Sequence, residues 1–153
     1  MILRSALSAA MACAFYGAAS AADAISPDAV TIVDSEITES LTGVPGDPVN
    51  GLAVFTGRKA GNCLACHMVT SLLDTQQFHG EVGVTLDGVG DTYSAAELRA
   101  RIVNPKVDLP DTIMPAFYRT SGFNRVADKF QDKTILSAQE VEDVIAYLLT
   151  LKD

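Results

Sequence analysis

Cysteine and histidine are both scarce in this sequence. Its 153 residues include three cysteines, Cys13, Cys63 and Cys66, and two histidines, His67 and His79. Cys13 lies in an N-terminal segment that we expect to be removed. If Cys63 and Cys66 act as a pair, no thiol remains to serve as a catalytic nucleophile, a persulfide carrier or a disulfide partner.

Long hydrophobic runs are also lacking beyond the N-terminus. Arg4 precedes an apolar, alanine-rich run over residues 6–18, and small residues follow it. The run is shorter than the roughly 20 residues of a membrane-spanning helix. The pattern predicts a secretory signal peptide over residues 1–24, cleaved after Ala21 or Ala24. We therefore expect a periplasmic, soluble protein without membrane insertion. A lipoprotein site at Cys13 is disfavoured because the preceding residues lack the expected leucine.

Basic residues are outnumbered by acidic ones. The sequence has 11 Lys and Arg against 19 Asp and Glu, a formal net charge of −8. An acidic protein is repelled by nucleic acid and by anionic membrane surfaces. We expect no nucleic-acid partner, whereas a partner protein with a basic face can dock.

The pattern that carries chemistry is Cys63-Leu64-Ala65-Cys66-His67, a C-x-x-C-H run typical of covalent c-type haem attachment. Two thiols one helical turn apart can add to the two vinyl groups on one edge of a porphyrin. The adjacent imidazole of His67 then ligates the iron from one face. Asn62 stands where an N-cap would open the haem-bearing helix.

Two other readings of the same cysteines are weaker. A thioredoxin-like redox dithiol belongs in a βαβ context, which the sequence does not show. A zinc site needs further Cys or His ligands, and beyond His67 only His79 is available. Haem attachment is therefore the favoured interpretation.

A six-coordinate haem iron needs a second ligand on its other face. Met68, His79 and Met114 are the candidates, and Met68 adjoins His67 too closely to reach around the ring. Many methionines only fill cores, but Met114 lies on a loop long enough to wrap the haem. His79, on a loop expected along the His67 side, stays as the alternative. Thioether ligation favours ferrous iron and suits electron transfer.

Capping signals and apolar periodicity predict an all-α fold with four helices and long loops. Asp47 and Pro48 open the first helix and Gly57 ends it. The haem-bearing helix follows it. Capping boxes begin the third and fourth helices at Ser94 and Ser137. The third helix ends near Val103, ahead of Asn104-Pro105. In the last helix, four residues form one apolar stripe, namely Val141, Val144, Ile145 and Leu148.

Two irregular stretches accompany these helices. Residues 25–46 are acidic and contain a β-branched run, so they are expected to form an extended arm. Val30, Ile32 and Val33 indicate that part of this arm packs on the domain or on a partner, with a disordered leader as the alternative. Between the third and fourth helices, residues 116–134 are expected to form a covering loop with one helical turn at 124–130.

The order of helix, haem motif, loops, methionine loop and C-terminal helix resembles the class I cytochromes c. Gly51 and Phe55 against Tyr147 are similar to the crossing of the terminal helices in that family. One departure is that the family's G-P-x-L reads Gly83-Val84-Thr85-Leu86 here. The resemblance implies that residues 47–153 form a class I cytochrome c-like domain with haem-wrapping loops.

The sequence also resembles the SoxX family, the monohaem subunits of the SoxXA sulfur-oxidation complex. The matching blocks are residues 57–67, 78–83, 112–118 and 134–148. The resemblance implies one covalently bound haem c on Cys63 and Cys66, with iron ligated by His67 and Met114. It also implies a larger SoxA-type cytochrome partner and transient contact with a SoxYZ-type sulfur carrier. The complex would act as a cysteine S-thiosulfotransferase, with this chain accepting and relaying electrons to a downstream acceptor.

Three alternatives stay open at this point. A free soluble monohaem carrier serving a terminal oxidase would use the same haem and ligands without an obligate partner. A ligand-binding or peroxidase haem would need an open iron. A structural or interaction module would carry no haem.

Overall fold

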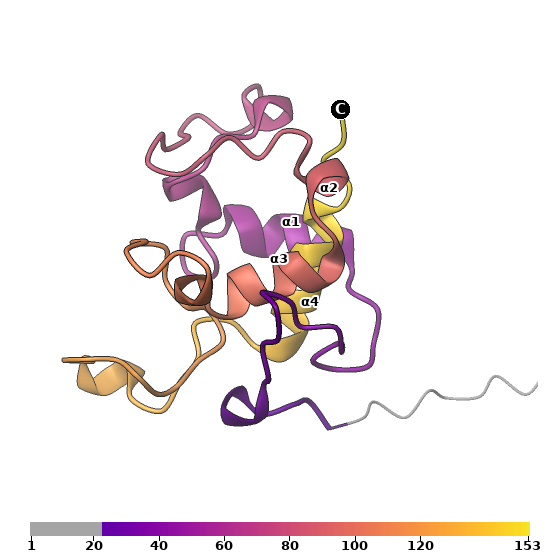
Figure 1. Ribbon diagram of the computed structural model, residues 1–153. Coiled ribbons are helices and arrows are strands. Elements are labelled where there is room, and N and C mark those ends of the chain that lie inside the picture. The colour runs from indigo at the N-terminus through magenta and orange to yellow at the C-terminus, as the bar shows by residue number, and fades with distance from the viewer. Residues whose placement is uncertain (1–22) are drawn as a thin grey trace, which may run out of the picture.

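The computed structural model describes residues 23–153 (Figure 1). The predicted signal peptide over 1–24, apart from its last two positions, lies outside the described residues. The described part contains four α-helices, and their bounds are α1 Pro48–Thr56, α2 Val89–Thr92, α3 Ala95–Val103 and α4 Ala138–Leu148. Five 3-10 turns accompany them: η1 Pro27–Ala29, η2 Cys63–Ala65, η3 Thr70–Leu72, η4 Pro105–Val107 and η5 Asp128–Phe130. Within residues 23–153, pairing of extended backbone is limited to one isolated bridge between Val33 and Glu36, so the all-α prediction is confirmed.

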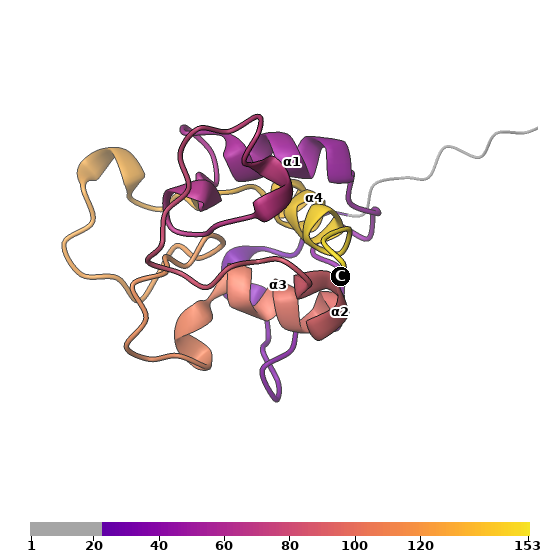
Figure 2. The same ribbon diagram turned by 90° about the horizontal axis from the view of Figure 1, so that it is seen from above.

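The central packing contact is the crossing of α1 over α4, visible from above in Figure 2. Gly51 makes it possible, because a Cβ there would lie 1.9 Å from the Asp143 carbonyl oxygen and 2.9 Å from the Tyr147 Cβ. Phe55 and Tyr147 pack beside it in a tilted arrangement, with ring centroids 5.2 Å apart and ring planes at 58° to each other. The predicted crossing of these helices is confirmed.

The predicted helix starts are also observed. Asp47 accepts a hydrogen bond from the Val49 amide, and Ser94 and Ser137 each form a complete capping box. Gly57 ends α1 with an extended backbone (φ −70°), so its left-handed freedom is not used there. The turn expected within 124–130 is η5.

The prediction of an α-helix at the haem motif is wrong. Its residues make one 3-10 turn, η2, and Asn62 adopts a left-handed conformation (φ 50°) with no side-chain cap bond. The reason is a tight reversal after α1, in which the Asn62 amide donates to the Gly57 carbonyl at 3.1 Å. The second α-helix is instead α2, whose four residues are too few to show an apolar period.

The N-terminal arm packs on the domain, so the disordered-leader alternative does not hold. Ile37 and Leu41 are buried in the core, and Val30 and Ile32 pack partly against it, whereas Val33 is exposed. In Figure 1 the arm, drawn in indigo, crosses α3 and α4. The described residues contain no helix with the length and apolar character needed to cross a bilayer.

Candidate functional site

The two thiols of the motif lie at the ends of η2: Cys63 is its first residue, and Cys66 directly follows its last. In 3-10 geometry, residues three apart are eclipsed, and the amides of Cys66 and His67 both donate to the Cys63 carbonyl, at 3.1 and 2.9 Å. Cys63 and Cys66 are half-buried and form no disulfide. Burial, reinforced by the nearby Cys66, raises the pKa of the Cys63 thiol to about 12. The Cys63 sulfur is therefore a protonated thiol at neutral pH.

The His67 ring is oriented by the backbone of the following loop. Its Nδ1 lies 2.7 Å from the Val84 carbonyl oxygen. A carbonyl only accepts, so Nδ1 carries the proton and Nε2 keeps a lone pair for a metal. Val84 stands where the family has proline, and the missing proline does not disturb this contact because the acceptor belongs to the main chain.

Glycines let this loop lie against the motif. A Cβ on Gly83 would sit 2.5 Å from His67 Cε1, and one on Gly80 would sit 2.1 Å from the Ala65 carbonyl oxygen. The Gly83 and Gly80 amides donate to the Cys66 and Leu64 carbonyls, each at 2.8 Å. The glycine spacing over 80–86 predicts an irregular loop on the His67 side, and the structure shows that Gly80 and Gly83 allow its close approach to the motif.

His79 lies on the same side of the motif as His67. Its Nδ1 accepts a hydrogen bond from the Val69 amide at 3.2 Å, two residues after His67. The proton is then on Nε2, which is buried and has no partner among the described residues. In this state neither nitrogen of His79 has a free lone pair with which to bind a metal.

Met114 lies on the long segment between η4 and α4. In Figure 1 this segment, drawn in orange, lies on the same side of the molecule as η2. The Met114 side chain is half-buried against the core. The Met114 amide donates to Thr112 Oγ1 at 3.1 Å, and Lys106 Nζ contacts the Thr112 carbonyl. Three residues on, the Phe117 amide donates to the Ile102 carbonyl at 3.0 Å. Hydrogen bonds at Thr112 before it and at Phe117 after it therefore hold the backbone on both sides of Met114.

These donors fit a c-type haem. The site offers two free thiols, an imidazole with its metal-binding nitrogen available, and a half-buried thioether on a separate segment. Residues 23–153 contain no cluster of three or more Cys, His, Asp or Glu that could hold a metal ion. The zinc reading therefore finds no support in the described part of the chain.

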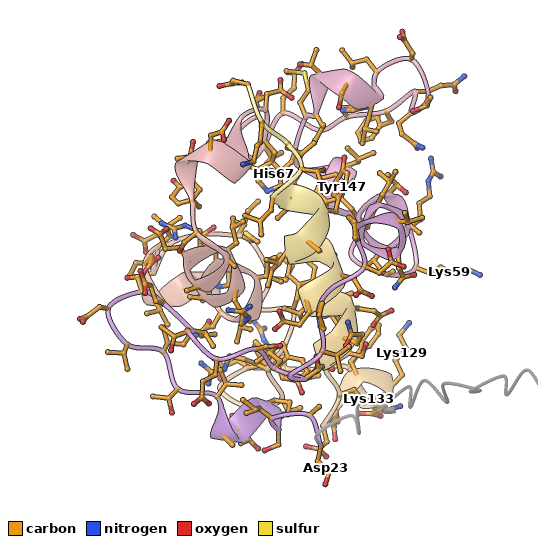
Figure 3. All side chains as sticks on the ribbon, turned by 90° about the vertical axis from the view of Figure 1, so that its right-hand side faces the viewer. Asp23, Lys59, His67, Lys129, Lys133 and Tyr147 are labelled. Carbon is orange, nitrogen blue, oxygen red and sulfur yellow. The ribbon has the colours of Figure 1, made fainter. Side chains whose placement is uncertain are left out.

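Tyr147 lies next to this site at the end of α4. Figure 3 labels it together with His67. Its hydroxyl is buried without a hydrogen-bond partner in the described residues. Burial, with Asp87 and Cys63 nearby, raises the pKa of Tyr147. The phenol is therefore kept neutral beside the cysteine-bearing turn.

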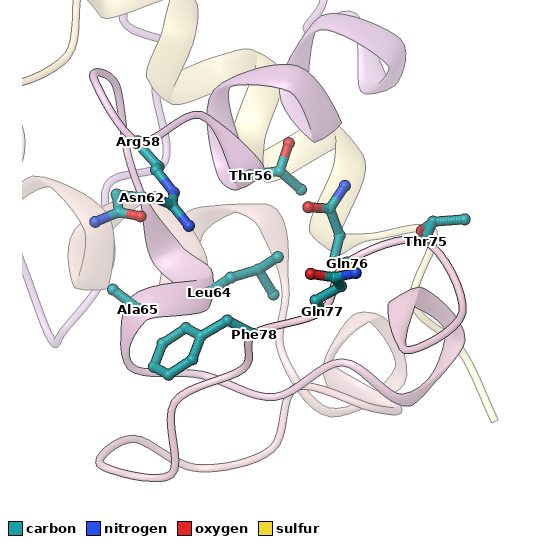
Figure 4. A pocket seen from close by; sticks show the side chains of 9 residues that line it. All are labelled: Thr56, Arg58, Asn62, Leu64, Ala65, Thr75, Gln76, Gln77 and Phe78. Atoms are coloured by element: carbon teal, nitrogen blue, oxygen red, sulfur yellow. The ribbon is translucent and has the colours of Figure 1, made fainter.

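A cleft of about 730 Å³ borders the outer side of η2 (Figure 4). Leu64 and Ala65 line it together with Arg58 after α1 and with residues 75–78. The segment that carries both thiols is therefore open to solvent on this side. The covering loop over residues 116–134 carries four basic residues, Arg119, Arg125, Lys129 and Lys133. Figure 3 shows the side chains of the two lysines projecting outward.

Comparisons with known proteins identify the family of the chain. The family model described as "Cytochrome c" matches residues 49–152, more than half of the chain. A chain of the solved structure described as "Crystal structure of SoxXA from P. pantotrophus" is 41% identical, with a TM-score of 0.78. The match covers 85% of this chain and 99% of that one. No curated protein sequence matches. The chain belongs to the cytochrome c family, which implies covalent haem c, and its recognition as a SoxX-like chain is confirmed.

Proposed function

We propose that this chain is the small, electron-accepting subunit of a periplasmic SoxXA-type complex. The observation that carries the proposal is the 41% identity, over 85% of the chain, to a chain of a SoxXA structure. The four site residues are Cys63 and Cys66 as thioether attachments and His67 and Met114 as iron ligands. The haem, when bound, supplies a one-electron redox centre.

The chain's own residues attach, orient and shield that centre. Cys63 and Cys66 anchor it to η2, and the Val84 carbonyl holds His67 in the tautomer that leaves Nε2 available. Met114, on the segment between η4 and α4, would supply the second iron ligand. Ligation by both His67 and Met114 would leave no open position for a substrate, which favours electron transfer over the peroxidase and ligand-binding readings.

The sulfur chemistry belongs to the partners. Coupling thiosulfate to a carrier-protein thiol releases two electrons, and a persulfide-type reaction centre needs a cysteine. In residues 23–153 the only cysteines are Cys63 and Cys66, which haem attachment consumes. The chain therefore relays electrons, while a larger SoxA-type cytochrome couples thiosulfate to a SoxYZ-type carrier cysteine.

The test is co-expression with a SoxA-type subunit in a host that matures c-type cytochromes. A tag on this chain should recover a second haem polypeptide in equal amount. The complex should become reduced when thiosulfate and a SoxYZ-type carrier are both added, and not when the carrier cysteine is replaced by serine. Recovery of a single haem chain that thiosulfate leaves oxidised would instead favour the free electron carrier.

A further inference from the structure

The N-terminal arm lies outside the residues that match the cytochrome c family model, 49–152. It is nevertheless built into the core. The Ile37 amide donates to the Ala96 carbonyl on α3 at 3.1 Å. The Leu41 amide donates to Glu142 Oε1 on α4 at 2.8 Å, and Leu41 is fully buried. The arm is therefore held by both helices.

A buried ion pair fastens this attachment. Arg99 on α3 binds both carboxylate oxygens of Glu142 on α4, at 2.8 and 2.9 Å. A third bond runs from Arg99 Nη1 to the Ile37 carbonyl at 2.6 Å. Buried, hydrogen-bonded charge pairs of this kind hold their partners in one geometry. The arm consequently has a rigid base on the helices.

The N-terminal end of the arm contacts the segment that carries Met114. Tyr118, four residues after Met114, is buried and donates its hydroxyl to the Ile25 carbonyl at 2.7 Å. The Ile25 amide in turn donates to the Leu41 carbonyl at 2.8 Å, next to the ion pair. Nearby, Thr120 and Ser121 donate to Asp28 at 3.3 and 3.2 Å. A continuous chain of hydrogen bonds therefore leads from α4 through the arm to the methionine segment.

We propose that the arm is a strap that holds Met114 in place for ligation, and that Tyr118 is the positioning residue through which it acts. The inference rests on the proposed ligation of iron by Met114. A loop that carries a ligand can open by local unfolding, and its opening is governed by the few bonds at its ends. Removal of the Tyr118 hydroxyl should make the segment open more often without changing the ligand itself.

The experiment compares ferric holoprotein of the wild type and Tyr118→Phe. Imidazole, used as the probe, enters the sixth position only after Met114 leaves, so its limiting binding rate reports opening. Tyr118→Phe should keep the methionine absorption band yet bind imidazole about 3- to 10-fold faster at saturation, as expected for loss of one hydrogen bond. Asp28→Ala should raise the rate by a smaller factor because its contacts are exposed.

Two controls separate the strap from general loosening. Tyr93→Phe removes a hydroxyl just before α3, away from the methionine segment, which meets α3 at Ile102. Val144→Ala thins the core on α4 and lowers global stability. Both should bind imidazole at the wild-type rate. A wild-type rate in Tyr118→Phe, with the band intact in the wild type, overturns the strap alone. Absence of the band from the wild type overturns Met114 ligation and the strap together.

Discussion

His67 Nδ1 and the Val84 carbonyl oxygen lie 2.7 Å apart, and this contact orients the imidazole of the haem motif. It is formed by a main-chain acceptor in a loop that can approach only because position 83 is glycine. Where the family pattern has proline, this chain presents the carbonyl from Val84. The geometry of the loop, rather than the proline itself, supports the ligand.

Gly83→Ala should therefore destabilise the holoprotein. The new methyl group would lie 2.5 Å from His67 Cε1, and the proposed iron ligation would keep the ring from moving away. Overpacking of this kind costs about 1–3 kcal/mol. Guanidinium unfolding followed by haem absorption measures the loss. Glu81→Ala, at an exposed neighbouring position, should stay within about 0.5 kcal/mol of the wild type. Equal stability of the two variants would contradict the close packing of Gly83 against the His67 ring.

The second prediction concerns the helix crossing. Gly51→Ala would place a Cβ 1.9 Å from the Asp143 carbonyl oxygen, which is backbone and cannot rotate aside. The α1 and α4 helices would have to separate, at a cost of about 1–3 kcal/mol or more. Thermal unfolding of the holoprotein measures it. Val49→Ala, 77% exposed on the same helix, serves as the control. A Gly51→Ala variant as stable as Val49→Ala would show that the crossing is looser than described.

Structural features that depend on residues close together in the sequence were predicted, and those that depend on distant residues were not. Caps at Asp47, Ser94 and Ser137 were predicted correctly because each depends on residues a few positions apart. The 3-10 form of η2 was missed because the reversal at Asn62 is imposed by its packing behind α1. The sequence also showed Arg99 and Glu142 only as charges, since their pairing spans 43 residues of chain.

That ion pair supplies the third prediction. Arg99 and Glu142 are both buried, so Glu142→Gln leaves a guanidinium without its compensating charge. Breaking a buried pair in this way costs about 3–5 kcal/mol. Asp91→Asn, which breaks the exposed pair with Lys152, should cost less than about 1 kcal/mol. Chemical unfolding measures the free energy of unfolding of both variants. A similar decrease in the two would mean that burial does not increase the cost of breaking the ion pair.

The fourth prediction is a pH dependence at the start of α3. Hydrogen bonds from the Ser94 backbone amide, and then from its side chain, lower the pKa of Glu97. A lowered carboxylate pKa contributes stability above its unfolded value, about 4.3, and loses it as pH falls through the folded value. The stability difference between wild type and Glu97→Gln should be constant at neutral pH and vanish in acid. Ser94→Ala should reduce the same acid-dependent difference without abolishing it, because the backbone amide at position 94 still donates to the Glu97 carboxylate. A difference that persists unchanged in acid would contradict the cap.

The central claim is that haem is covalently attached at Cys63 and Cys66 and ligated by His67 and Met114. Its most direct test is the weak charge-transfer absorption of ferric haem that accompanies methionine ligation, recorded for the wild type and for Met114→Ala after a denaturing gel has confirmed attached haem. We predict that the wild type shows the band and that Met114→Ala retains the haem but loses the band. Absence of the band from the wild type, or its survival in Met114→Ala, would contradict the account.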